Sequence, residues 1–369
     1  MEHPSSLESL AMKLFADCYR GRRVLVTGHT GFKGSWLSLW LNQLGAQVSG
    51  LALPPATDPN HWDLLDLNLP EQRIDIRDSA AVLRAVTDAA PEIVFHLAAQ
   101  PLVRRSYRDP LETWSTNVLG TANVLEACRQ APQVRAIVVV TTDKCYQNQE
   151  WSWGYRETDR LGGHDPYSAS KAATEILAAS YRNAFFHIPE APLMATARAG
   201  NVIGGGDWSE DRLIPDMVRA IAARSPLEIR SPHATRPWQH VLESLSAYLM
   251  LGQQLLEGRR EFADAFNFGP DPEGNRSVAE VLTRLHAHWD ELNWYATSKI
   301  QPHEANLLYL DNSKAKMQLN WRPVWALDQT LAATASWYRQ FLQDGATQSR
   351  SQLAAYIADA RSAGLAWSA

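Results

Sequence analysis

Short apolar runs alternate with amphipathic segments between residues 22 and 199, and this alternation limits the possible folds more than any other feature. The apolar runs have the length of buried strands, and the segments between them carry apolar residues at helical spacing. Helices and strands that alternate in this way indicate an α/β fold, in which helices cover both faces of a parallel sheet. Helices are expected over 33–45, 78–89 and 110–130 and from Asp165 onward. Strands are expected over 22–27, 47–53, 72–76, 92–99, 135–142 and 193–199.

The pattern changes after residue 200, where longer loops and short strands such as LEIR and AFNFG separate the predicted helices. A chain of 369 residues is long for one hydrophobic core, so two lobes are expected. We expect a Rossmann-type doubly wound domain over 1–200, to which some later segments return, and a smaller interleaved substrate lobe over 201–345. We expect residues 346–369 to form a helical tail that docks onto the preceding part of the chain. Its apolar face consists of Leu353, Tyr356, Ile357 and Ala360. The helices predicted after residue 200 are 212–223, 240–256, 277–288 and 328–343.

Charge, cysteine usage and hydropathy exclude several classes of protein. The net charge is −5 and no basic run exceeds RGRR at 20–23, which argues against tight nucleic-acid binding. Cys18, Cys128 and Cys145 are scattered without a C-x-x-C pair, which is typical of a reducing compartment. The N-terminus lacks the apolar core of a signal peptide, and no apolar run reaches membrane-spanning length. We therefore expect a cytoplasmic protein without a membrane segment and, since no metal-ligand motif is present, without a metal.

The segment TGHTGFKG at 27–34 joins the first expected strand to the first helix. Gly28, Gly31 and Gly34 have the spacing G-x-x-G-x-x-G, which suits a tight turn and a helix N-terminus aimed at a pyrophosphate. Such glycines can mark a simple turn, but the flanking strand and helix favour a dinucleotide site. The acid expected about 20 residues further on, at the end of the second strand, is missing. No basic residue for a 2′-phosphate stands there either, and we expect NAD rather than NADP.

Two further segments carry candidate reactive side chains. YSASK places Tyr167 and Lys171 four residues apart, hence on one face of a helix. A second match, YATSK at 295–299, lies in the second lobe away from the glycine loop, and we interpret it as surface or packing residues. TTDK follows the buried run AIVVV, where burying an unpaired Asp143 or Lys144 is costly. The alternative is an ion pair at the surface, since most charges at strand ends are solvated.

These motifs together resemble those of the extended short-chain dehydrogenase/reductase family, over about residues 20–340. In that family a tyrosine phenolate takes a proton from a substrate hydroxyl while hydride leaves to the nicotinamide. The resemblance implies this role for Tyr167. It also implies that Lys171 lowers the pKa of Tyr167 and bonds the nicotinamide ribose, and that Thr142 bonds the substrate hydroxyl.

The charged pair after the strand is similar to that of one subset of the family, the nucleotide-sugar 4,6-dehydratases, which usually carry Asp-Glu where this chain has Asp143 and Lys144. Oxidation at C4 of the sugar acidifies the C5 proton. Loss of water from C5–C6 then needs a base at C5 and an acid at the C6 hydroxyl, after which hydride returns to C6. The resemblance implies that Asp143 is the acid. Lys144 stands at the position of the base, and both a role as the base and a purely electrostatic role stay open.

Three longer segments extend the resemblance and imply CDP-glucose as the substrate: CYQNQEWSWGYRE, RAGNVIGGGDWSEDRLIPD and RPWQHV. The implied substrate contacts are Asn201, Arg212, Arg236 and His303. For the two arginines the alternative is an ordinary surface charge.

The implied cofactor contacts are Gly28, Gly31, Phe32, Gly34, Asp75, Ile76, Leu97, Ala98, Ala99, Tyr167 and Lys171. For Asp75 the alternative is that its side chain caps the following helix.

The expected function is that of a lyase with tightly bound NAD, which converts CDP-D-glucose to CDP-4-dehydro-6-deoxy-D-glucose in deoxysugar biosynthesis. One alternative is a 4,6-dehydratase or 4-epimerase for another nucleotide sugar, and an epimerase needs no acid at position 143. Another is a non-catalytic NAD-binding regulator, which would lack Tyr167 or Lys171. Family members are usually dimers, so the resemblance implies a homodimer or higher homo-oligomer joined through helices 110–130 and 166–186.

Overall fold

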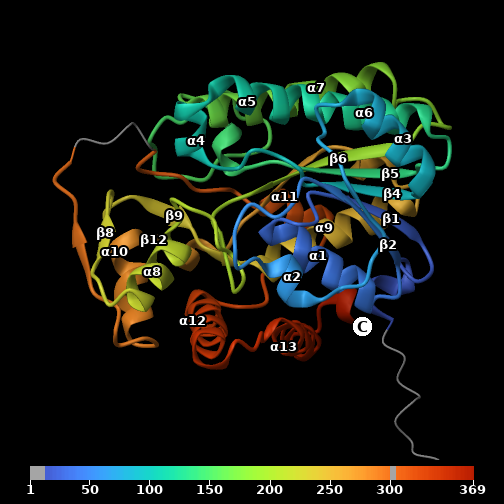
Figure 1. Cartoon of the computed structure of the whole chain (residues 1–369). Helices are drawn as coiled ribbons and strands as arrows, with labels where there is room; N and C mark the ends of the chain where they lie inside the picture. Colours follow the sequence, from blue (N-terminus) through green and yellow to red (C-terminus); the bar gives the residue numbers. More distant parts are fainter. Residues whose placement is uncertain (1–12, 300–304) are drawn as a thin grey trace, which may run out of the picture.

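The computed structural model describes residues 13–299 and 305–369, and a sheet of seven parallel strands forms its centre (Figure 1). The strands lie in the order β11-β6-β5-β4-β1-β2-β3. This order reverses between β1 and β4, and doubly wound sheets bind ligands beside the carboxyl ends of the strands at such a point. The bounds are β1 Arg23–Thr27, β2 Gln47–Ala52, β3 Glu71–Arg73, β4 Ile93–His96, β5 Ala136–Val140, β6 Leu193–Ala199 and β11 Ala265–Phe268.

Helices cover both faces of the sheet because alternate strand residues point to opposite layers. Leu25 and Val94 belong to one apolar cluster, under the helices that lie above the sheet in Figure 1. Val24 and Phe95 belong to the other cluster, on the side of the lower helices. The upper layer contains α3 Ser79–Ala89, α4 Val103–Arg108, α5 Pro110–Trp114, α6 Thr121–Gln130 and α7 Pro166–Ala184. The lower layer contains α1 Phe32–Gln43, α2 His61–Leu65, α9 Val241–Leu256 and α11 Ser313–Gln318.

A smaller lobe lies to the left of the sheet in Figure 1 and is built from short elements. Its strands form two-stranded sheets, β12 with β9 and β13 with β8, while β10 pairs with β7 beside the main sheet. The remaining helices, α12 Leu327–Asp344 and α13 Ser349–Ser362, lie below, and α13 contacts α1. The other bounds are β7 Val202–Ile203, β8 Leu227–Ile229, β9 Thr235–Pro237, β10 Gln239–His240, β12 Asn275–Ser277, β13 Trp294–Ala296, α8 Leu213–Ala222 and α10 Val278–His286. Short 3-10 turns are η1 Leu14–Asp17, η3 Asp143–Cys145, η4 Arg260–Phe262, η5 Pro272–Gly274 and η6 Ala366–Ser368.

The structure confirms the α/β fold and differs from the sequence-based expectation in several places. The strand expected over 72–76 is β3, which ends at Arg73. AFNFG, expected among the short strands of the second lobe, is β11 and forms an edge of the main sheet beside β6. The strand expected over 92–99 ends at His96. The Leu97 N–H still donates to the Thr27 carbonyl at 3.1 Å, whereas the Ala98 N–H donates to the Thr27 hydroxyl at 3.2 Å. The helix expected over 110–130 contains a π-helical turn, η2 Ser115–Gly120, between α5 and α6. The tail helix docks as expected, and all four of its predicted apolar residues are buried.

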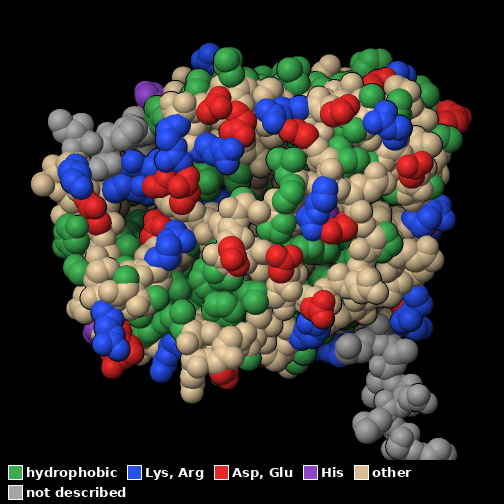
Figure 2. Space-filling model, viewed as in Figure 1, with side chains coloured by type: hydrophobic (Ala, Val, Ile, Leu, Met, Phe, Trp, Pro, Cys, Tyr) green, Lys and Arg blue, Asp and Glu red, His purple; other side chains and the backbone are tan. Residues whose placement is uncertain are grey.

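The outer surface of the upper helix layer carries exposed hydrophobic side chains. Leu111 of α5 is 79% exposed, Leu119 of η2 is 62% exposed and Ile176 of α7 is 60% exposed. Figure 2 shows hydrophobic side chains along this upper edge of the molecule, over α5 and α7. Within the described ranges, no helix is both long enough and apolar enough to cross a membrane.

Candidate active site

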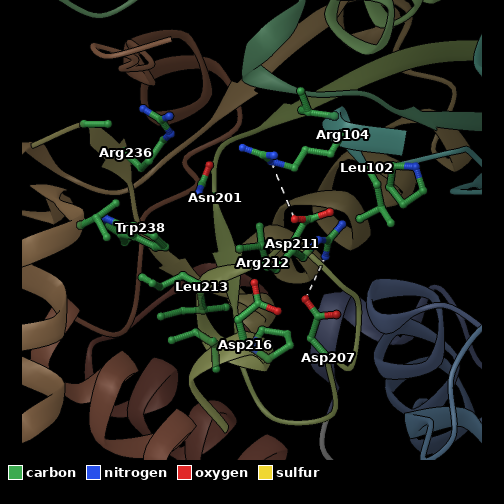
Figure 3. Close-up of a pocket in the computed structure, with 18 of the residues that line it drawn as sticks. Leu102, Arg104, Asn201, Asp207, Asp211, Arg212, Leu213, Asp216, Arg236 and Trp238 are labelled. Atoms are coloured by element: carbon green, nitrogen blue, oxygen red, sulfur yellow. Dashed lines mark hydrogen bonds and ion pairs between the residues drawn. The ribbon is translucent and has the colours of Figure 1, made fainter. Parts of the chain in front are cut away.

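A pocket lies between the carboxyl end of the sheet and the smaller lobe. The segment after β5 contributes Thr142, Asp143 and Lys144, and α7 contributes Tyr167. The other walls carry the predicted substrate residues Asn201, Arg212 and Arg236, which Figure 3 shows around the cavity. The structure therefore brings together residues that are up to 94 positions apart in the sequence, and they stand where a parallel sheet binds its ligand.

The strand-end segment buries its charges. Thr142 caps η3, because its hydroxyl accepts the Lys144 N–H at 3.3 Å, and the same hydroxyl donates to Asp143 Oδ1 at 3.0 Å. Asp143 is 1% exposed, and its Oδ2 atom has no hydrogen-bond partner in the described part of the chain. Lys144 Nζ lies 3.9 Å from Asp143 Oδ1, too far for a hydrogen bond. The alternative of a solvated surface ion pair is therefore wrong, and Asp143 presents a carboxyl oxygen with unused bonding capacity.

Tyr167 and Lys171 project from the first turns of α7. This helix begins here because Asp165 accepts the Ser168 N–H at 2.9 Å and Pro166 occupies the first helical position. Burial raises the pKa of Tyr167 to about 12, while a hydrogen bond with Thr142 and the Arg212 guanidinium act to lower it. Burial lowers the pKa of Lys171 to about 8, and its ammonium donates to the Val140 carbonyl at 3.4 Å. The second Tyr-Lys match lies at the surface as interpreted, since Tyr295 is 49% exposed.

The glycine loop has the close packing expected of a dinucleotide site. Gly28 has a φ of +74°, and a Cβ there would lie 2.7 Å from the Ala98 nitrogen. A Cβ on Gly34 would lie 2.1 Å from the Gly28 carbonyl oxygen. Gly31 is the N-cap of α1, which begins at Phe32, so the free N–H groups of the helix start beside this loop. The loop therefore offers a backbone cradle for an anion.

The residues predicted to contact the adenosine half of the cofactor lie at the ends of neighbouring strands. Ile76 is buried against Gly120, and Asp75 pairs with Arg77, which lowers the pKa of Asp75. The alternative that Asp75 caps the next helix is wrong, because Asp78 is the N-cap of α3. The sequence predicted no basic residue at the end of β2, and this prediction is also wrong.

Arg73 of the adjacent β3 reaches the end of β2, where its Nη1 donates to the Leu53 carbonyl at 3.4 Å. Its other terminal nitrogen, Nη2, donates to Glu71 Oε1 at 2.6 Å. The sequence did not reveal this approach, because Arg73 is separated from β2 by the loop that contains α2.

The two predicted phosphate-binding arginines differ in their environment. Arg236 on β9 is 4% exposed and donates to the Thr235 carbonyl at 2.8 Å, so it is not an ordinary surface charge. Arg212, which precedes α8, pairs with Asp207 at 2.9 Å (Figure 3). Arg104 lies across from these residues and contacts Asp211 at 3.7 Å. The predicted residue His303 lies outside the described residues.

One lysine in the pocket is not among the residues that the sequence motifs predict. Lys33 lies in the first turn of α1 and donates to the Tyr248 hydroxyl at 3.1 Å. Burial, together with the nearby charges of Arg212 and Lys171, lowers the pKa of Lys33 to about 7. Lysine is rare in this chain, with seven in 369 residues, so a lysine inside the glycine motif was the available signal.

Asn117 supports the same region from the helix layer. Its side chain accepts the Gln100 N–H at 2.8 Å and donates to the Gln100 carbonyl at 3.1 Å and to the Ser170 hydroxyl at 2.9 Å. Asn117 lies in the π-helical turn η2, where its side chain is buried. Single π-helical turns of this kind are frequent at functional sites. Nothing in the helical spacing of the sequence predicts such a turn.

Comparisons with known proteins identify the family. The model of the family described as GDP-mannose 4,6 dehydratase matches residues 25–334. The chain is 47% identical, over 332 residues, to a CDP-glucose 4,6-dehydratase from Salmonella typhimurium, and the match covers 88% of this chain and 92% of the relative. This chain belongs to the GDP-mannose 4,6-dehydratase family. Within that family its fold is that of the extended short-chain dehydrogenases/reductases, as the sequence motifs predicted.

Solved structures similar to this member of the GDP-mannose 4,6-dehydratase family include epimerases. An epimerase from Methanothermobacter thermautotrophicus has a TM-score of 0.79 at 24% identity, covering 91% of this chain and 97% of the other. A Thermus thermophilus UDP-glucose 4-epimerase in complex with NAD has a TM-score of 0.73 at 25% identity, covering 86% and 98%. Dehydratases and epimerases therefore share this fold, so the residues of the site, and not the fold, must distinguish dehydration from epimerisation.

Proposed function

We propose that this chain is an NAD-dependent nucleotide-sugar 4,6-dehydratase that converts CDP-D-glucose to CDP-4-dehydro-6-deoxy-D-glucose. The buried carboxyl group of Asp143, beside Thr142 at the pocket, carries the proposal. Neither simple oxidation nor epimerisation at C4 needs an acid at this place, whereas loss of water from C6 does. The 47% identity to the Salmonella typhimurium CDP-glucose 4,6-dehydratase supports the choice of substrate.

The proposed roles follow from the chemistry of each side chain. Tyr167 takes the proton of the C4 hydroxyl, and the nearby Arg212 guanidinium, which acts to lower the pKa of Tyr167, helps to stabilise the phenolate. Asp143 donates a proton to the C6 hydroxyl as it leaves as water. Lys144 reaches the same pocket and either takes the C5 proton or stabilises the negative charge of the enolate that results.

The glycine loop fits a dinucleotide. Gly28 and Gly34 leave no room for a Cβ, and Gly31 and Phe32 bring the N–H groups of α1 to the place where a pyrophosphate would bind. Lys171 would hold the nicotinamide ribose, the Leu97–Ala99 segment would line the dinucleotide, and Asp75 and Ile76 would hold the adenosine half. Bound NAD supplies the reversible hydride acceptor for oxidation at C4 and reduction at C6. The ion pair of Glu71 with Arg73 near the end of β2 favours NAD over NADP, because Glu71 offsets the positive charge of Arg73 that could otherwise hold a 2′-phosphate.

The substrate diphosphate would bind between the lobes. Arg212 and Arg236 supply positive charge on two sides of the pocket, and Asn201 supplies a side-chain amide. His303 remains a predicted contact of the nucleotide.

The test is product formation from CDP-, dTDP-, UDP- and GDP-glucose, followed by the alkali-shifted absorbance of the 4-keto sugar and by mass spectrometry for the loss of water. We expect a ketosugar from CDP-glucose at a rate well above that with the other three. Tyr167→Phe, which removes only the phenolic hydroxyl, is the matched control and should be inactive. A 4-epimer without loss of water, or no reaction with any sugar, would contradict the proposal.

We further propose a homodimer formed by the exposed face of α5, η2 and α7, in a reducing cytoplasm. Leu111, Leu119 and Ile176 give this face the apolar character of a subunit interface, and the three cysteines are unpaired. Light scattering should give twice the mass of 41.2 kDa for the wild type and about the monomer mass for Leu119→Glu. A monomeric wild type would contradict the proposed interface.

A further inference from the structure

A buried ion pair lies directly behind the strand end that carries Thr142 and Asp143, and the proposed reaction does not use it. Glu175 of α7 pairs with Arg198 of β6 at 2.8 Å, and the two side chains are 2% and 4% exposed. Glu175 lies one helical turn after Lys171 on the same helix. Such a pair is costly to bury and is often replaceable by apolar residues without loss of stability, so its presence beside a reactive lysine needs an explanation.

Glu175 is fully bonded. Its Oε1 accepts the Thr141 hydroxyl, and its Oε2 accepts the Thr196 hydroxyl at 2.7 Å as well as Arg198. Burial acts to raise the pKa of Glu175, but the Arg198 charge and these hydrogen bonds outweigh it and lower the pKa. Arg198 is itself held by the Tyr146 hydroxyl at 2.7 Å. The carboxylate is therefore held in one position and in its ionised form.

Lys171 depends on such a partner. Burial lowers the pKa of Lys171 to about 8, and among the groups that act to raise it Glu175 is the strongest, followed by Cys145 of η3. His96 of β4 and Lys33 of α1 also interact with Lys171, but burial lowers the pKa of His96 to about 3, so this imidazole is neutral, and Lys33 adds only positive charge. Without the Glu175 charge, the pKa of Lys171 would fall further below its ordinary value, and the ammonium form would be less favoured.

We propose that Glu175 is a positioning residue that holds the Lys171 ammonium charged and, through Thr141, fixes the strand end that carries Thr142 and Asp143. Arg198 keeps Glu175 ionised, because its positive charge and its hydrogen bond lower the pKa of Glu175. The inference rests on the proposed function, because a protonated Lys171 matters only if Tyr167 reacts as a phenolate.

Two variants of Glu175 separate charge from shape. Glu175→Gln keeps the length and most hydrogen bonds but removes the charge, whereas Glu175→Asp keeps the charge and shortens the side chain. For kcat/KM with CDP-glucose, we expect the basic limb of the pH profile to move down by about 1–3 pH units in Glu175→Gln. It should stay within about half a pH unit of wild type in Glu175→Asp, given the retained charge. Thr196→Val removes one hydrogen bond to Glu175 and no charge, so the basic limb of its kcat/KM profile should lie at the wild-type pH.

A second readout needs no turnover. The chain has seven lysines, so protein labelled with ¹³C at lysine Cε gives few NMR signals, and the signal lost in Lys171→Met belongs to Lys171. Its titration should move down in Glu175→Gln and not in Glu175→Asp. This result would support the inference even if no nucleotide sugar were converted, which would contradict only the proposed function.

The double variant Glu175→Gln/Arg198→Met removes both charges together and avoids an unpaired buried ion that would prevent folding. It should show the same downward movement of the Lys171 titration. An unchanged Lys171 titration in Glu175→Gln or in the double variant would overturn the inference, as would equal movement in Glu175→Gln and Glu175→Asp.

Discussion

Three of the four buried histidines in the described part of the chain, His61, His96 and His240, should make the fold sensitive to mild acid. His61 lies between the hydroxyls of Ser35 and Ser349, each at 2.7 Å, whereas His96 and His240 are enclosed elsewhere in the core. Burial lowers the pKa of all three imidazoles from 6.5 to about 3. Because the folded-state pKa is the lower one, the unfolded chain takes up protons first. The stabilisation is thus complete above pH 6.5 and is lost as the pH falls.

The magnitude follows from linkage. Each pH unit below 6.5 removes about 1.4 kcal/mol of unfolding free energy per histidine, or about 6 kcal/mol for three at pH 5.0. Glu243 opposes this loss, since burial raises its pKa from 4.5 to about 7. A carboxyl group with a raised pKa stabilises the fold at low pH, and this stabilisation is lost as the pH rises through 7. Protonation of Glu243 therefore adds about 2 kcal/mol to the free energy of unfolding as the pH falls from 6.5 to 5.0. The net loss of about 4 kcal/mol is a large part of a typical domain stability of about 5–15 kcal/mol.

Urea unfolding followed by tryptophan fluorescence at pH 7.5, 6.5, 5.5 and 5.0 measures this loss. Wild type should lose about 4 kcal/mol between pH 6.5 and 5.0, and the matched control Glu243→Gln should lose about 6 kcal/mol, because the compensating carboxyl group is gone. A loss of under about 1 kcal/mol in both proteins would refute the reasoning, since it would mean that the three imidazoles take up protons in the folded state as readily as in the unfolded one.

Three further predictions concern the site. Asp143→Asn should slow loss of water by about 10²–10⁴-fold while a transient NADH absorbance still appears, and unchanged turnover would argue against its role as the acid. Gly34→Ala should destabilise the fold by about 1–3 kcal/mol, because its Cβ would lie 2.1 Å from the Gly28 oxygen. Gly31→Ala, whose Cβ would meet that oxygen only at 3.4 Å, should cost less than Gly34→Ala in the same thermal unfolding experiment, and equal losses would contradict the packing argument. CDP should bind more weakly as the pH rises from 6 to 8.5, because Lys33, whose pKa is about 7, loses its charge. Calorimetry should show that the affinity of Lys33→Met for CDP depends less on pH than that of wild type. An equally steep pH dependence in Lys33→Met would contradict this role of Lys33.

The sequence predicts the sheet and its helices well because burial on both faces makes the strands continuous apolar runs. It also predicts the strand-end acid and the Tyr-Lys pair, since local spacing places them on known elements. It does not place AFNFG in the main sheet, because strand pairing over such a separation leaves no local pattern.

Long-range contacts account for the residues that the sequence analysis missed. Lys33 and Glu175 look like ordinary charges on helices, and only the fold shows that both side chains point inward. Arg198 was the more visible signal, because an arginine inside the apolar run LMATARA must have a buried partner. Arg73 could not be assigned to the end of β2 from sequence, since the sheet brings β3 beside it.

The central claim is that one pocket oxidises the sugar at C4, removes water from C5–C6 and returns the same hydrogen at C6. The most direct measurement follows the label from CDP-[4-²H]glucose by NMR and mass spectrometry of the product. We expect one deuterium in the C6 methyl group. A methyl group free of deuterium, or deuterium still at C4, would contradict the claim.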